Sequence, residues 1–204
     1  MDQGPTHSIM PMKTTLKRIV KYFFLALIIP FYLCYCFFAV IGDSDRVFLS
    51  ASQFLSLIPG RLGIYMRAAF YRLACSNTSD EISIGFLTLL SHRDTTIRKG
   101  VYIGPQCNIG KCTIGKNTLL GSGVHILSGS KQHGFDDLAT PIQQQHGSYE
   151  KIEIGEDCWL GNGAIIMTAV ADQTIVAAGS VVNKPFALAS IIGGNPAQLL
   201  RTRS

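Results

Sequence analysis

An aliphatic residue recurs every six positions through the second half of the chain, and a glycine often follows it directly. A period of six matches neither an α-helix, with its period of about 3.6, nor the simple alternation of a strand. It is typical of a parallel β-helix, in which each hexapeptide forms one short strand and one turn and three hexapeptides complete a coil. The aliphatic positions are Ile103, Ile109, Ile114, Leu120 and Ile126, then after an interruption Ile154, Leu160, Ile166, Val170, Val176 and Val182.

Small side chains two positions before the aliphatic residue are also expected to face inward, among them Cys107, Cys112 and Cys158. The six cysteines form no C-x-x-C pair or metal-type cluster in the sequence, so we predict that they are reduced and buried. A β-sandwich is the alternative for a glycine-rich β-chain. Its strands recur about every 8–12 residues, which does not fit a period of six.

The first part of the chain has a different character. Residues 1–18 are polar, contain Pro5 and Pro11, and are expected to form a flexible tail. Tyr22–Ile41 then carries no charge over about twenty residues, the length that a helix needs to cross a bilayer core. We therefore predict a membrane anchor and interfacial helix over residues 19–73 and a repeat domain over residues 82–204.

Basic residues on both sides of the apolar run indicate that both flanks lie on the cytoplasmic face. Pro30 is expected to break the helix, and Val47–Ile58 is too short to span a bilayer alone. This pattern favours a re-entrant or hairpin anchor over a single span. Ile64–Leu73 is predicted to be an interfacial helix, with aromatic side chains at the headgroups and arginines toward anionic lipid: Tyr65, Phe70, Tyr71, Arg67 and Arg72.

The net charge of +5 is modest, and the basic residues are scattered along the chain. A nucleic-acid binder concentrates its basic residues on one face, so nucleic acid is not expected as a partner. Anionic lipid or a phosphorylated co-substrate fits this charge pattern better.

The repeat is followed by EIGEDCWLGNGAIIM, VAAGSVVNK and GGNPAQLLR, and over residues 82–203 it resembles the hexapeptide-repeat acyltransferase superfamily. It is similar to sugar O-acetyltransferases of polysaccharide clusters and to galactoside, maltose and streptogramin acetyltransferases. The resemblance implies a mainly β fold with a left-handed parallel β-helix, a homotrimer, and acetyl-CoA bound between subunits. The segment VADQTI is two residues shorter than the family pattern, which predicts one tightened corner.

A polar insert interrupts the repeat between about Lys131 and Ile152. Acyl transfer to a hydroxyl needs a general base that titrates near neutrality, and histidine suits this best. His133 lies where the resembling acetyltransferases place their catalytic histidine, so it is the predicted base. His146 is the alternative base or an acceptor-binding residue, and Asp136 or Asp137 is expected to orient the imidazole or to bind acceptor.

No metal site is predicted. The γ-carbonic anhydrases share this fold and bind zinc through three histidines, two of them closely spaced. In this chain His125, His133 and His146 are eight and thirteen residues apart, which does not match.

The resemblance also implies which residues contact acetyl-CoA. Small turn residues would lie against the pantetheine, an indole would supply an apolar wall, and cations would neutralise phosphate charge. Where the family has an arginine this chain has Gln198, so phosphate binding is expected to depend on Arg201 or Arg203. The implied set is Trp159, Asn162, Ala178, Asn183, Lys184 and Arg201.

These observations predict a membrane-anchored O-acetyltransferase at the cytoplasmic face of a bacterial inner membrane. The acceptor would be a sugar hydroxyl of a cell-envelope or exopolysaccharide precursor, and a lipid-linked form would suit the anchor. Two alternatives stay open: N-acylation of an amino sugar or xenobiotic, and a non-enzymatic trimeric scaffold at the membrane.

Overall fold

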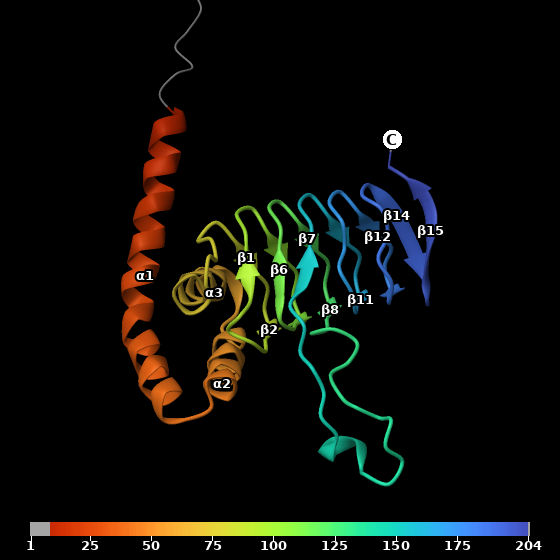
Figure 1. The fold of residues 1–204 in the computed structure, drawn as a ribbon. Helices are drawn as coiled ribbons and strands as arrows, with labels where there is room; N and C mark the ends of the chain where they lie inside the picture. The colour runs from red at the N-terminus through yellow and green to blue at the C-terminus, as the bar shows by residue number, and fades with distance from the viewer. Residues whose placement is uncertain (1–8, 204) are drawn as a thin grey trace, which may run out of the picture.

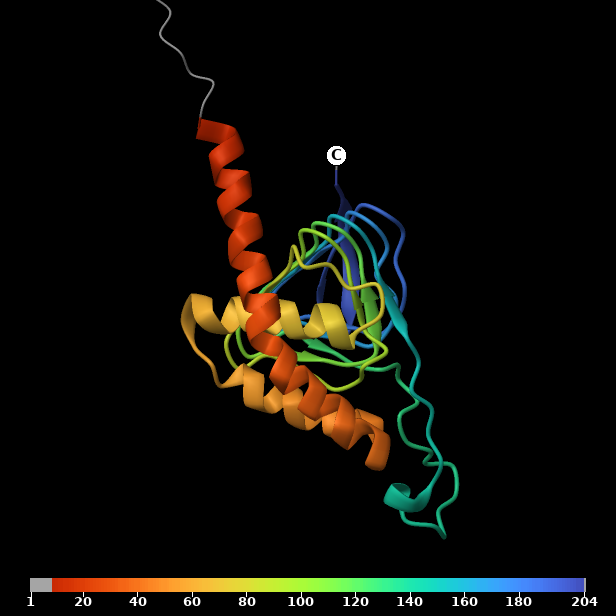
Figure 2. The same ribbon diagram turned by 90° about the vertical axis from the view of Figure 1, so that its left-hand side faces the viewer.

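The computed structural model describes residues 9–203, which form three helices followed by a solenoid of short strands (Figure 1). The helices are α1 (Ile9–Ile41), α2 (Ser44–Ser56) and α3 (Gly60–Ala74). In the two views α1 forms the outermost layer, α2 and α3 lie behind it, and the solenoid follows (Figures 1 and 2).

Three sheets form the three faces of the solenoid, and all strands pair in parallel except β14 with β15. In spatial order the first sheet contains β1 (Ser83–Ile84), β4 (Tyr102–Ile103), β7 (Leu119–Leu120), β10 (Trp159–Leu160), β12 (Ile175–Val176), β14 (Ser190–Gly194) and β15 (Ala197–Thr202). The second contains β13 (Val181–Val182), β11 (Ile165–Ile166), β8 (His125–Ile126), β5 (Asn108–Ile109) and β2 (Leu89–Leu90). The third contains β3 (Thr96–Ile97), β6 (Cys112–Ile114) and β9 (Ile152–Ile154).

The predicted repeat positions form the core of this solenoid. Each aliphatic residue is buried and stands in register with its equivalent one coil away, as in the column Ile84, Ile103, Leu120, Leu160, Val176 and Ile192. The hexapeptide periodicity therefore predicted the parallel coils correctly, because stacking buries one aliphatic side chain per strand.

The three inward cysteines and Cys75 are buried as predicted, but Cys34 is exposed and Cys36 is only half-buried, because both lie on α1. Cys107 Sγ donates to the Gly121 carbonyl at 3.2 Å, and Cys158 Sγ donates to the Ala171 carbonyl at 3.2 Å. Burial raises the pKa of both thiols and that of Cys112. These thiols are therefore protonated packing groups at neutral pH.

The predicted tight corner lies between β11 and Val170. Val170 is buried and forms a single parallel bridge with Ile154 instead of a strand. Its amide donates to Glu153 at 2.9 Å, and its carbonyl accepts from Gly155 at 2.8 Å. Only four residues separate Ile166 from Val170, instead of the usual six. This shorter step keeps Val170 stacked in the core but leaves no room for a longer strand.

Glycine is required where successive coils approach at a corner. A Cβ on Gly161 would lie 2.5 Å from the Ala178 amide nitrogen, which is closer than real Cβ contacts. The close spacing of the coils thus explains why a small residue follows the aliphatic one in the repeat.

Three expectations about the N-terminal part need correction. Helix α1 runs unbroken through the exposed Pro30, and it already includes residues 9–18 of the expected tail; the rest of that tail, residues 1–8, lies outside the described residues. The term mainly β suits only the solenoid, because helices of 33, 13 and 15 residues precede it. The left-handed sense of the β-helix stays a prediction.

Helix α3 buries three of the five residues that were predicted to face lipid headgroups, whereas Arg72 is exposed and Tyr65 is half-buried. Arg67, Phe70 and Tyr71 are fully buried, because α3 packs on the open end of the first coil (Figure 2). Arg67 donates from Nε to the Ile84 carbonyl at 2.9 Å. Its Nη1 donates to the carbonyls of Leu55 and Ile58 at 2.9 and 2.8 Å. Helix α3 therefore caps the solenoid.

Candidate active site

The insert leaves the solenoid after β8 and projects from it as a long two-legged loop (Figures 1 and 2). Backbone bonds hold the legs together at the base: Ser148 N donates to the Lys131 carbonyl at 2.7 Å, and Glu150 N donates to the Ser128 carbonyl at 2.9 Å. A short 3₁₀ turn, η1 (Ile142–Gln144), lies in the outer part of the loop. The solenoid therefore fixes the base of the insert and leaves its outer part exposed.

An open hollow of about 550 Å³ lies between the two legs. His133 and Asp136 come from the outgoing leg, and His146 comes from the returning leg. The structure thus brings three of the predicted side chains around one hollow. The remaining lining residues are Lys131, Gly134, Phe135, Gly147 and Ser148, of which sequence reasoning had singled out none.

Asp137 does not line this hollow. Its Oδ1 accepts from the Ala139 amide at 2.9 Å, and its Oδ2 accepts from the Thr140 hydroxyl at 2.6 Å. The bonds from Thr140 and Ala139 hold the pKa of the Asp137 carboxyl below its usual range. Asp137 therefore shapes the loop, and Asp136 is the carboxylate that shares the hollow with the histidines.

The two histidines of the hollow are exposed. Within residues 9–203, neither His133 nor His146 has a side-chain hydrogen bond to another residue. An exposed imidazole beside a carboxylate can accept a proton from a bound hydroxyl and later return it. The arrangement suits general-base chemistry.

A second hollow, of about 260 Å³, lies beside the base of the insert. His92 contributes to it, with Nδ1 2.9 Å from the Ser91 hydroxyl and its ring 5.2 Å from that of Tyr149. Gln132, Asn108 and Ser128 complete its polar lining. Sequence reasoning gave His92 no role, because its approach to Tyr149 depends on how the insert returns to the first coil.

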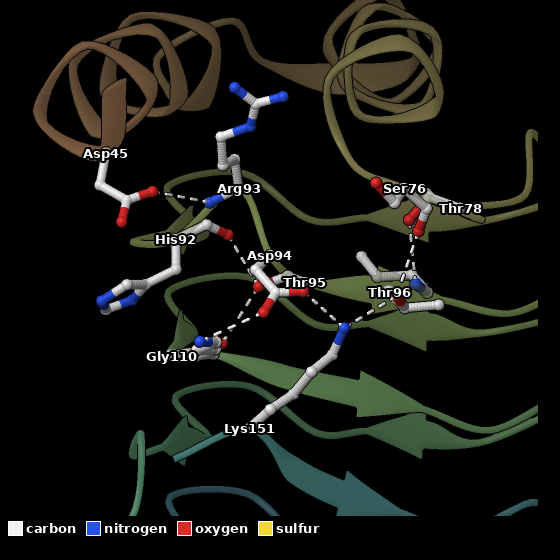
Figure 3. A network of polar contacts seen from close by, with 12 residues as sticks. Asp45, Ser76, Thr78, His92, Arg93, Asp94, Thr95, Thr96, Gly110 and Lys151 are labelled. Carbon is white, nitrogen blue, oxygen red and sulfur yellow. Dashed lines mark hydrogen bonds and ion pairs between the residues drawn. The ribbon is translucent and has the colours of Figure 1, made fainter. Parts of the chain in front are cut away.

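A polar network fastens the returning leg to the first coil (Figure 3). Lys151 Nζ lies 2.7 Å from Asp94 Oδ1 and 3.3 Å from the Thr96 hydroxyl, and Lys111 Nζ lies 3.2 Å from Asp94 Oδ2. The bonds from Lys151 and Lys111 hold the pKa of Asp94 below its usual range. One carboxylate thus joins the insert to two coils.

The residues implied to contact acetyl-CoA lie mostly along later coils. Trp159 exposes 54% of its surface on β10, and Asn162 and Ala178 occupy successive corners, joined by the bond from Gly179 N to the Asn162 carbonyl at 2.8 Å. Asn162 Oδ1 also accepts from the Ser122 amide at 3.1 Å. The Asn162 side chain therefore has a structural role whatever else it contacts.

The predicted phosphate-binding cations differ in their availability. Lys184 Nζ lies 3.4 Å from Gln198 Oε1 and 5.6 Å from the centre of the Phe186 ring. Arg203 is held by Asp157 at 3.2 Å. Arg201, on β15, is exposed and forms no ion pair among the described residues, so it is the better placed of the two arginines. Asn183 is exposed just after β13.

No hollow among those identified in residues 9–203 contains both His133 and the acetyl-CoA set. The insert leaves from the third coil, whereas Trp159, Ala178 and Lys184 belong to later turns of the solenoid. The same part of the chain contains no cluster of three metal-binding side chains.

Comparison with known proteins identifies the repeat. The family model described as bacterial transferase hexapeptide (six repeats) matches residues 94–128. The chain is 30% identical over 116 residues to the putative colanic acid biosynthesis acetyltransferase WcaF of Escherichia coli (strain K12), covering 53% of this chain and 58% of that protein. It is 31% identical over 109 residues to a probable macrolide acetyltransferase of Lysinibacillus sphaericus, covering 46% and 61%. The chain thus spans about three fifths of these relatives.

Solved structures share the fold over most of the chain. A maltose O-acetyltransferase from Clostridium difficile 630 superposes with a TM-score of 0.70 at 18% identity, covering 79% of this chain and 88% of that one. The hexapeptide-repeat containing-acetyltransferase VCA0836 from Vibrio cholerae gives a TM-score of 0.62 at 21% identity, covering 80% and 94%. The solenoid therefore has the fold of hexapeptide-repeat acetyltransferases, as the sequence resemblance predicted.

Proposed function

We propose, from this hexapeptide-repeat acetyltransferase fold, that the chain transfers an acetyl group from acetyl-CoA to a sugar hydroxyl of a cell-envelope or exopolysaccharide precursor. The observation that carries the proposal is the hollow in the insert, where two exposed histidines and one free carboxylate meet. The names of the relatives, a colanic acid acetyltransferase and a maltose O-acetyltransferase, support an acetyl donor and a sugar acceptor.

His133 is the proposed general base. It removes the proton from the acceptor hydroxyl as the oxygen attacks the thioester carbonyl, which forms the new C–O bond of a tetrahedral intermediate. The C–S bond then breaks, and the imidazolium returns the proton to the leaving thiolate. Asp136, on the same leg, stabilises the imidazolium, and His146 binds the acceptor from the other leg.

The donor site would combine residues of the later coils with the insert of a neighbouring chain in a homotrimer. Trp159 offers an exposed apolar wall, and the corner at Ala178 lets a pantetheine amide approach the backbone. Lys184 and Arg201 are exposed cations for the phosphates. In a single chain His133 lies apart from these donor-site residues, and association between chains would bring the His133 of one chain to the donor-site residues of the next.

The test is acetyl transfer by the full chain in detergent. Acetyl-CoA should bind in a calorimetric titration, and thiol release should depend on an added saccharide, with the ester located by NMR of the product. Release that depends only on amine acceptors would favour N-acylation. If acetyl-CoA gave no binding heat and no thiol were released, an enzymatic role would be contradicted and a scaffold favoured.

A further inference from the structure

We propose that α1 lies in the plane of an anionic membrane surface instead of crossing the bilayer, and that it docks the solenoid end-on against the headgroups. The segment Thr15–Ile41 is long and apolar enough to cross a membrane by length and composition. Its packing within the chain is what points to the other orientation.

One face of α1 packs against the capping helices along the apolar run. The Phe24 ring stacks on Tyr65 with centroids 5.0 Å apart, and the Phe31 ring lies 5.7 Å from Phe70. Further along, the Tyr32 hydroxyl donates to the Leu73 carbonyl at 3.2 Å. Because α3 caps the solenoid, this packing holds α1 across the end of the solenoid (Figure 2).

Charged groups lie beside the first turn of this apolar run, next to Phe24 and Leu25. Lys21 Nζ is 3.4 Å from Asp80 Oδ1, and Arg72 Nη1 is 2.7 Å from Asp80 Oδ2. The first coil adds the exposed pair of Lys99 and Glu81 at 3.2 Å. A crossing α1 would carry this cluster and the first coil into the hydrocarbon, where ionised side chains are costly.

The opposite face of α1 is apolar and unpartnered within the described residues. No residue from Tyr22 to Ile41 is charged, and the large exposed side chains of this stretch are Tyr22, Phe23, Leu27, Ile29, Leu33, Phe37, Phe38, Val40 and Ile41. A contiguous apolar surface of this extent marks an interaction site. One face toward protein and one toward hydrocarbon is the pattern of a helix that lies in a membrane interface.

Helix α2 extends this apolar face. An open groove of about 430 Å³ between α1 and α2 is lined almost entirely by carbon-rich side chains, including Phe31, Phe38 and Phe54. Phe54 and Leu57 beside it are exposed. Methylene groups of lipid chains can fill such a groove without any polar cost.

Cations border the apolar stretch at both ends. Lys17 and Arg18 are exposed one turn before Tyr22, and Arg46 is exposed just after the stretch, 3.6 Å from Asp43. Basic side chains beside an apolar helix face complement anionic headgroups. With both ends of α1 at one surface, the solenoid and its insert lie on that same side.

Fluorescence quenching by brominated lipids measures the depth of α1 directly. Single cysteines replace Phe23, Leu33 and Val40 in a full chain that carries Cys34→Ala and Cys36→Ala, and each is labelled with a fluorophore. The vesicles contain phosphatidylcholine with a minority of phosphatidylglycerol. We expect one shared depth, about 5–10 Å below the headgroups. A label at Leu33 near the bilayer midplane, with the other two shallower, would overturn the proposal.

Sidedness gives a second readout. Lys17→Cys and Arg46→Cys in the same background should both react with a membrane-impermeant maleimide added outside the vesicles. Protection of one of the two until the vesicles are opened would mean that α1 crosses the bilayer and would contradict the in-plane arrangement.

A variant pair separates lipid from protein as the occupant of this face. Leu33→Glu with Phe37→Glu, at side chains that are 61% and 62% exposed, should lower vesicle co-flotation at least about tenfold, since each lost apolar side chain weakens partition by that order. Leu188→Glu, at the far end of the solenoid and 65% exposed, should leave it unchanged. A wild-type chain that stays off vesicles while the α1 variants change its oligomeric state would show that the face binds another copy.

Discussion

At the scale of single residues, His133 and Arg67 represent two opposite uses of a basic side chain. His133 is exposed at an open hollow, whereas Arg67 is fully buried and donates to three backbone carbonyls. The first position can take part in chemistry because solvent and substrate reach it. The second can only hold elements together, and burial lowers its pKa.

Replacement of His133 should stop catalysis without unfolding the protein. His133→Ala is expected to lower kcat about 10²–10⁴-fold, the usual contribution of a general base, while the Kd for acetyl-CoA stays the same. His125→Ala is the matched control, because His125 is an exposed histidine on β8 outside the hollow. Turnover near wild type in His133→Ala would mean that His146 is the base or that no histidine of the hollow acts as one.

Replacement of Arg67 should destabilise the junction between helices and solenoid. Arg67→Met removes three charge-assisted bonds and leaves the carbonyls of Leu55, Ile58 and Ile84 without those donors. We expect a loss of about 2–4 kcal/mol in the free energy of unfolding, measured by urea denaturation in detergent. Arg98→Met, at an exposed arginine of the first coil, should change it by less than about 0.5 kcal/mol.

At the scale of elements, the insert depends on its attachment through Asp94. The pKa of this carboxyl is lower in the folded chain than in the unfolded one, so its ion pairs stabilise the attachment above about pH 4. That contribution is lost as the pH falls through the folded pKa. Because Asp94 is half exposed, solvent screens the effect, and it should not exceed about 1 kcal/mol.

Asp94→Asn should therefore loosen the insert at neutral pH. Limited proteolysis is expected to cut the insert faster in Asp94→Asn than in wild type at pH 7, and a hydrogen-exchange comparison should show the difference shrinking below about pH 4. Asp136→Asn is the control, since Asp136 forms no ion pair among the described residues. A difference that stays constant with pH would exclude the carboxylate as its cause.

The sequence predicted the solenoid well and the helices poorly, for a physical reason. A coil repeats the same interior environment, so Ile103 and Leu120 show a period that needs no knowledge of distant contacts. The burial of Phe70 and Arg67 depends on the end of the first coil, which no local pattern in α3 encodes. Pro30 is accommodated because it lies on the exposed side of α1.

For the candidate site, the interrupted repeat predicted the insert. The resemblance to the acyltransferases selected His133 within it, and the structure places His133 at the hollow of the insert, while its role as base stays a prediction. The second hollow, with His92 against Tyr149, could not be predicted, because it forms only where the returning leg meets the first coil.

At the scale of the whole molecule, the proposed function requires that neighbouring chains complete each site. Mixed trimers test this. A chain with His133→Ala supplies an intact donor edge, and a chain with Lys184→Ala and Arg201→Ala supplies an intact insert. If each site uses one insert and the donor edge of the next chain, refolded equal mixtures should regain about a quarter of wild-type turnover. Mixtures as inactive as their parents would place each site within a single chain.

The way the helices cap the first coil also decides how long the stack of strands can become. A solenoid ends in strand edges whose free amides and carbonyls invite another strand, and exposed edges of this kind lead to fibres. Here side chains occupy those groups on all three faces: Arg67 binds the Ile84 carbonyl, Ser52 accepts from the Leu90 amide at 2.9 Å, and Thr78 accepts from the Ile97 amide at 3.0 Å. At the other end β15 closes the largest sheet in the antiparallel sense. The residues of α2, α3 and the segment after them that bind these strand edges therefore also hinder one solenoid from polymerising onto the next.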